Sequence, residues 1–79
     1  LQNIKVYPNP VQHNTSVIFP EFDRPAVLRL VDARGTLMRT IQLQPNVQRL
    51  DMDLSACPAG VYYLKWTGRI GQTVTIIRN

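Results

Sequence analysis

Alternation of apolar and polar side chains with a period of two residues is the pattern that most restricts how this 79-residue chain can fold. It runs in short segments bounded by Gly, Pro, Asn and Asp, and no window carries the apolar stripe of an amphipathic helix. The segments predicted to be strands are 3–7, 15–19, 26–32, 36–43, 47–53, 60–67 and 72–78. Short strands at this spacing favour an all-β sandwich or barrel with a single compact core.

Two of the connections predict hairpins. Asp32 and Gly35 bound a tight turn, because an Asp side chain accepts hydrogen bonds from turn amides and Gly tolerates a positive φ. Segment 67–71 places two glycines between β-rich runs. We therefore expect strands three and four, and also the last two strands, to pair antiparallel.

The inward-facing members of the alternation give the expected core. It comprises Ile4, Val6, Val17, Phe19, Leu28, Leu30, Leu37, Ile41, Leu50, Met52, Leu54, Tyr62, Leu64, Trp66, Val74 and Ile76. Cys57 is the only cysteine, so it cannot form an intrachain disulfide, and we interpret it as a buried, inert thiol.

Segment 53–64 is the most specific stretch of the chain. A strand ends, Pro58 and Gly60 follow, and Tyr62 is the third residue of the next strand. This arrangement resembles the tyrosine corner of Greek-key sandwiches, in which a buried phenol donates a hydrogen bond to backbone a few residues upstream. A structural role for Tyr62 is therefore expected, and a role in recognition could be additional.

The polar residues give little support to catalysis. His13 is the only histidine and has no cysteine or carboxylate at ligand spacing, and Asp51 and Asp53 share one exposed strand face. We therefore expect no enzyme, no cofactor and no metal site. The net charge of +4 comes from basic residues scattered along the chain, which suit either solvated strand faces or an anionic partner, and nothing indicates nucleic-acid binding.

The first connection, Tyr7-Pro8-Asn9-Pro10, has little conformational freedom because each proline fixes its own φ and Pro10 also restricts Asn9. We expect Pro8 and Pro10 to act mainly on the fold. Tyr7 and Asn9 are the expected points of contact for a partner.

Three anchors stand in order along the chain: Tyr7-Pro8-Asn9-Pro10, then Val31-Asp32-Ala33-Arg34-Gly35, then 53–55 with 59–64. Together they resemble the type A C-terminal sorting domain of the type IX secretion system of Bacteroidota, over nearly the whole chain. The resemblance implies a seven-stranded immunoglobulin-like Greek-key β-sandwich. The matching recognition motif comprises Tyr7, Pro8, Asn9, Pro10, Asp32, Gly35, Gly60, Tyr62, Val74, Ile76, Ile77 and Arg78. Arg78 stands where the family usually has lysine, and Cys57 where an apolar residue is common.

The resemblance implies a signal without catalytic activity. Residues 1–79 would then form one sorting domain of a longer precursor, because the chain starts without an initiator methionine or a targeting segment. The implied partners are the outer-membrane translocon, shuttle and sortase proteins of the type IX system, with anionic lipopolysaccharide as a further candidate. The implied location is the periplasm in transit, then the outer membrane, the cell surface or the medium. No apolar run is long enough to span a bilayer.

Two other functions stay open at this point. A domain of the same family could remain attached to its parent and dock to a partner or to lipopolysaccharide through its arginines. A generic immunoglobulin-like or carbohydrate-binding module would instead use an outward Trp66, Tyr7 or Tyr63 as a stacking platform. We also expect the terminal strand to lie at a sheet edge, where it could pair with a receptor strand or support a dimer.

Overall fold

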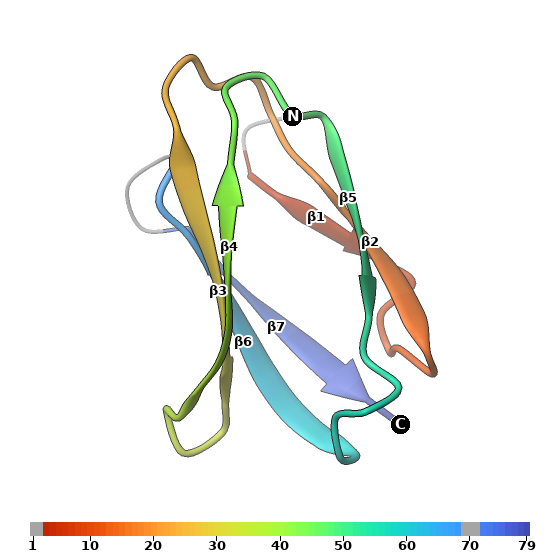
Figure 1. Cartoon of the computed structure of the whole chain (residues 1–79). Helices are drawn as coiled ribbons and strands as arrows, with labels where there is room; N and C mark the ends of the chain where they lie inside the picture. The colour runs from red at the N-terminus through yellow and green to blue at the C-terminus, as the bar shows by residue number, and fades with distance from the viewer. Residues whose placement is uncertain (1–2, 69–71) are drawn as a thin grey trace.

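The computed structural model describes residues 3–68 and 72–79 (Figure 1). Each predicted strand is present, with ends that differ from the expected ones by no more than two residues. The strands are β1 (Lys5–Tyr7), β2 (Asn14–Ile18), β3 (Ala26–Asp32), β4 (Leu37–Leu43), β5 (Arg49–Asp53), β6 (Gly60–Trp66) and β7 (Gln72–Arg78). The described part of the chain contains no helix.

The strands form two sheets packed face to face, as the two layers in Figure 1 show. One sheet has the order β1-β2-β5 and the other the order β4-β3-β6-β7, and all neighbouring strands are antiparallel. The chain therefore folds as the expected β-sandwich. Both predicted hairpins, β3–β4 and β6–β7, are confirmed by the pairing, although residues 69–71 of the second turn lie outside the described residues.

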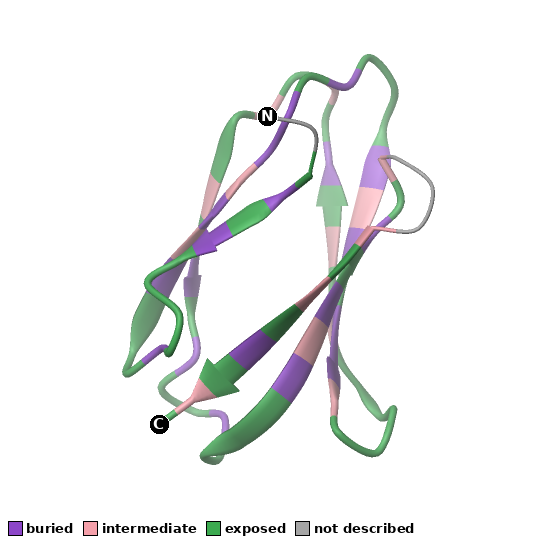
Figure 2. Cartoon of the chain, turned by 180° about the vertical axis from the view of Figure 1, so that it is seen from behind, coloured by how far each residue is buried: buried purple, intermediate pink, exposed green. Residues whose placement is uncertain are grey.

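The core lies between the two sheets, and Figure 2 shows exposed residues along β7 alternating with intermediate or buried ones. The expected core residues that are buried are Ile4, Val6, Val17, Phe19, Leu28, Leu30, Met52, Leu54, Tyr62, Leu64, Trp66 and Ile76. Cys57 is buried as well. Alternation therefore identified the inward face of most strands.

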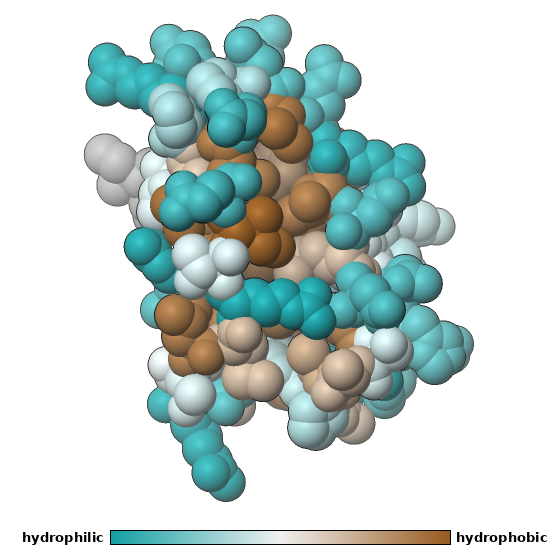
Figure 3. All heavy atoms as spheres, in the orientation of Figure 1, coloured by the Kyte–Doolittle hydropathy of each residue, from teal (hydrophilic) through white to brown (hydrophobic). Residues whose placement is uncertain are grey.

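Half-buried apolar residues mark one open side of the sandwich. Ile41, Val47 and Leu50 pack against the core from β4, from the loop before β5 and from β5. Figure 3 shows apolar side chains gathered between β4 and β5. The guanidinium of Arg39 crosses from β4 and donates to the backbone oxygen of Asp53 at 2.7 Å, which links the two sheets on this side.

The prediction that Leu37 is a core residue was wrong, because its side chain is 53% exposed. The pairing of β3 with β4 shifts register between Leu30 and Val31: Leu30 lies opposite Arg39, whereas Val31 lies opposite Leu37. Met38 is therefore an extra residue in β4. One extra residue reverses the faces of those beyond it, so Leu37 points to the outside of the sandwich.

Several core residues were missed: two lie in connections, Val31 is on an outward position, and Ala26 and Leu43 are inward strand residues that pair with each other. Val11, Phe22, Ala26, Val31 and Leu43 are buried. Val11 and Phe22 lie in loops, where periodicity gives no signal.

Trp66 packs between two phenylalanines of the β2–β3 connection. Its ring centroid lies 5.6 Å from that of Phe19 and 5.4 Å from that of Phe22, the latter with edge-on geometry. Gly68 lies against the same indole, because a Cβ there would stand 2.1 Å from a ring carbon of Trp66. Since Trp66 is only 2% exposed, it cannot serve as a stacking platform for a sugar.

The two leucines that this register places on opposite faces should respond differently to truncation. Leu64→Ala removes a fully buried side chain and is expected to lower the free energy of unfolding by about 2–5 kcal/mol. Leu37→Ala removes an exposed one and should change it by less than about 0.5 kcal/mol. Urea unfolding of both variants measures the difference, and equal losses would contradict the bulge at Met38.

Candidate functional site

Residues of the recognition motif gather at one end of the sandwich, the lower end in Figure 1. Four segments lie at this end: 8–11 between β1 and β2, 32–35 between β3 and β4, 54–60 between β5 and β6, and 75–79 at the end of β7. We call these four segments the motif end. Hydrogen bonds described below join segments 8–11 and 54–60 to segment 75–79, whereas those of Asp32 lie within its own hairpin.

Asn9 ties the first connection to the last strand. Its side-chain oxygen accepts a hydrogen bond from the N–H of Ile77 at 3.0 Å, and its amide nitrogen donates to the backbone oxygen of Thr75 at 2.9 Å. Val11 continues this pairing. Its N–H donates to the backbone oxygen of Ile77 at 2.7 Å, and its own backbone oxygen accepts the N–H of Asn79 at 2.9 Å. The segment therefore acts as a short extra strand beside β7.

The two prolines around Asn9 are exposed, and each follows a cis peptide bond. The backbone oxygen of Pro8 accepts a hydrogen bond from the buried hydroxyl of Thr15 at 2.8 Å, which joins the connection to β2. The side-chain amide of Asn9, an expected point of contact for a partner, binds the backbone of β7 in this structure. Tyr7 differs from it, since its side chain is 69% exposed.

Asp32 closes the β3–β4 hairpin in the predicted way. Its carboxylate accepts the N–H groups of Arg34 and Thr36, both at 2.9 Å, and its backbone oxygen accepts the N–H of Gly35 at 3.0 Å. Gly35 has a φ of 88°, which side chains rarely tolerate. The two motif residues of this turn thus fix its shape and leave the Arg34 side chain exposed.

Tyr62 forms the predicted tyrosine corner. Its hydroxyl donates to the backbone oxygen of Pro58 at 2.5 Å, and only 4% of the residue is exposed. Burial raises the pKa of the phenol above its usual value, and the neighbouring Cys57 and Asp32 act in the same direction. Gly60, which starts β6, has a φ of 155°.

Arg78 holds the β5–β6 loop against the end of β7. Its Nε donates to the backbone oxygen of Leu54 at 3.0 Å, and its Nη2 contacts that of Ser55 at 3.4 Å. The resemblance places Arg78 in the recognition motif as part of the terminal strand, and in the structure Arg78 is a half-buried link between segments. The partner in the β5–β6 loop is 24 positions away, so no local pattern indicated it.

The motif residues of β7 fall on two faces. Ile76 is fully buried and Val74 is half-buried, so both face the core rather than a partner. Ile77, at 45% exposure, is the apolar residue of this set that reaches the surface.

The strand lies at a sheet edge, as expected, but its outward backbone groups from Thr75 to Asn79 already bind Asn9 and Val11. A receptor strand could pair there only by displacing that segment.

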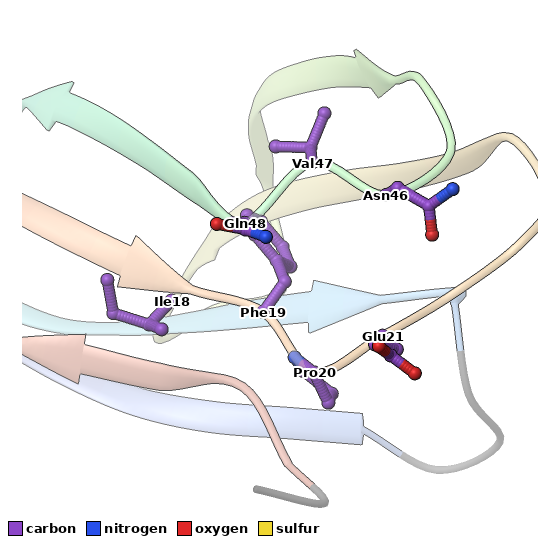
Figure 4. A pocket seen from close by; sticks show the side chains of 7 residues that line it. All are labelled: Ile18, Phe19, Pro20, Glu21, Asn46, Val47 and Gln48. Carbon is purple, nitrogen blue, oxygen red and sulfur yellow. The ribbon is translucent and has the colours of Figure 1, made fainter.

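The described residues contain no group of three or more His, Cys, Asp or Glu that could hold a metal ion. A hollow at the opposite end of the sandwich, shown in Figure 4, is lined by Ile18, Phe19, Pro20, Glu21, Asn46, Val47 and Gln48. Glu21 is its only titratable side chain, so it offers no acid–base pair. Among the described residues there is no helix long and apolar enough to cross a membrane.

Comparison with known proteins gives one family. The model of the family described as secretion system C-terminal sorting domain matches residues 5–78. No curated protein matches the chain. The family match covers all four segments of the motif end except Asn79.

Removing the Asn9 amide should loosen the end of β7. Asn9→Ala loses two hydrogen bonds, so we expect the free energy of unfolding to fall by about 1–3 kcal/mol. Amide hydrogen exchange at Ile77 should accelerate, because that N–H loses its acceptor. Gln42→Ala, an exposed position on β4, is the control, and unchanged exchange at Ile77 in Asn9→Ala would contradict the pairing.

Removing the Tyr62 hydroxyl should lower stability in a pH-dependent way. Tyr62→Phe leaves the Pro58 oxygen without its donor, at an expected cost of about 1 kcal/mol near neutral pH. Because folding raises the pKa of Tyr62, the wild-type advantage is complete below pH 10, the usual phenol value, and declines as pH rises further. Urea titrations at several pH values measure this, with the exposed Tyr7→Phe as control. A gap between wild type and Tyr62→Phe that widens above pH 10 would contradict the assignment.

Proposed function

The chain belongs to the secretion system C-terminal sorting domains, which are non-catalytic signals for export through the type IX secretion system, and we propose that the machinery reads the motif end. One observation carries this proposal. Segments 8–11, 54–60 and 75–79 are far apart in the sequence, and the hydrogen bonds of Asn9 and Arg78 join them at one end of the sandwich, where the hairpin 32–35 also lies.

The motif residues would act by shaping this end rather than by touching the partner. The polar groups of Asn9, Asp32 and Tyr62 are all engaged in internal hydrogen bonds. Exposed side chains that they hold in place, such as those of Arg34 and Ala59, are the ones available for contact. Loops held by internal hydrogen bonds bind at low entropic cost because little has to be ordered on association.

The proposed partner is the outer-membrane translocon, which would carry the parent protein from the periplasm to the cell surface or the medium. Shuttle and sortase proteins of the same system would act after it. On this proposal a sortase then removes the domain and joins the parent to anionic lipopolysaccharide. Retention of the domain as a docking module is the alternative, and the mass of the exported product distinguishes the two.

Negative charge introduced at either end of the sandwich tests where the signal lies. The chain is fused behind a periplasmic reporter in a cell that has the type IX system. Arg34→Glu with Ala59→Glu changes two exposed side chains of the motif end and should reduce surface display on the order of tenfold. Arg24→Glu, at the opposite end between β2 and β3, should leave display unchanged. Equal surface display of the wild-type fusion, the double variant and Arg24→Glu, at unchanged melting temperature, would overturn the proposal.

A further inference from the structure

The outward side chains of β4, β3, β6 and β7 form a second surface, which we call the outer sheet face. Its half next to the motif end is apolar. Val31 is only 7% exposed although it points outward, because it lies between Leu37 on β4 and Tyr63 on β6. Val61 and Ile77 lie opposite each other on β6 and β7 and are 39% and 45% exposed.

The other half of the outer sheet face carries two like charges in direct opposition. Arg29 on β3 lies opposite Lys65 on β6, and both are exposed. Thr40 lies opposite Arg29 on the far side, and Thr73 lies opposite Lys65. Like charges at directly opposed positions destabilise a sheet. Folding alone therefore gives no reason for this row of two cations between two hydroxyls.

Within the part of the chain that the structure describes, no salt bridge joins an acidic residue to Arg29 or Lys65. Asp51 and Asp53 lie on β5 in the other sheet, and the Asp32 carboxylate is bound to turn amides. Glu21 and Asp23 lie in the β2–β3 connection. The salt bridge found among the described residues joins Arg49 to Asp51 and involves neither Arg29 nor Lys65.

We propose that the outer sheet face docks a protein of the export machinery whose surface places carboxylates beside an apolar patch. The carboxylates would meet Arg29 and Lys65, and the apolar patch would cover Leu37, Tyr63 and Ile77. Tyr and Arg are side chains enriched at the centres of protein interfaces. This proposal rests on the proposed function, and it extends the surface of contact from the motif end along the adjoining sheet.

Shape and size favour a protein surface over a membrane. The Cα atoms span 34 × 22 × 18 Å, so one face of the sandwich is of the same order as the roughly 800 Å² that each partner buries in a standard interface. Among residues 3–68 and 72–79, the outer sheet face has no apolar helix or loop to enter a bilayer, and Arg29 and Lys65 form one row rather than a ring around the apolar residues.

Lys65→Glu separates docking from folding, because the two roles predict opposite effects. The substitution puts a carboxylate opposite Arg29, so the melting temperature should stay the same or rise. It also removes complementarity with an acidic partner, so surface display of the reporter fusion should fall on the order of tenfold. Lys5→Glu, an exposed charge reversal on β1 of the other sheet, is the matched control and should keep full display.

A second variant tests the apolar half. Val61→Thr replaces an exposed β-branched residue outside the motif end by another, so the fold should be kept while display falls. Full display of both Lys65→Glu and Val61→Thr would overturn the proposal. Sedimentation of the isolated chain with phosphatidylglycerol vesicles, abolished by Lys65→Glu, would also overturn it by assigning the face to a membrane. A wild-type fusion retained in the periplasm would instead refute the proposed function and this proposal together.

Discussion

The pairing of the first connection with the last strand is the constraint on which the rest of the sandwich depends. β1 and β7 belong to different sheets. The side-chain amide of Asn9, just after β1, donates a hydrogen bond to the backbone oxygen of Thr75 in β7, which is 66 positions away in the sequence. At the other end of β7, the side-chain Nε2 of Gln72 donates a hydrogen bond to the side-chain oxygen of Asn3 at 2.6 Å. These contacts close one side of the core, whereas the other side is crossed by the guanidinium of Arg39.

Polar side chains that bind backbone groups recur wherever this small domain lacks regular pairing. Asn9 does so beside β7, Asp32 in a hairpin, Tyr62 at a corner and Arg78 across a loop. A chain of 79 residues buries a limited core, so the ordering of its loops has to come from such bonds. Several residues that the resemblance placed in the recognition motif thus help to fix the shape of one end of the fold.

Local rules were sufficient for the strands, for the turn at Asp32 and for the corner at Tyr62, because each depends on neighbours within a few positions. They failed for Leu37, since the extra residue Met38 in β4 leaves no mark on the alternation. They also failed for the roles of Asn9 and Arg78, whose partners are distant in sequence. The opposed charges of Arg29 and Lys65 became visible only once the register was known.

The hydrogen bonds between β7 and the first connection also make the shape of the motif end depend on the whole chain being intact. Segments 8–11 and 75–79 bind each other, so neither has its native environment unless both are present in one folded chain. A domain that lacks either segment would lose the arrangement at the motif end. A domain cleaved between the two segments would lose it as well once the fragments separate. A receptor that recognises this geometry would thereby reject damaged cargo without any separate proofreading step.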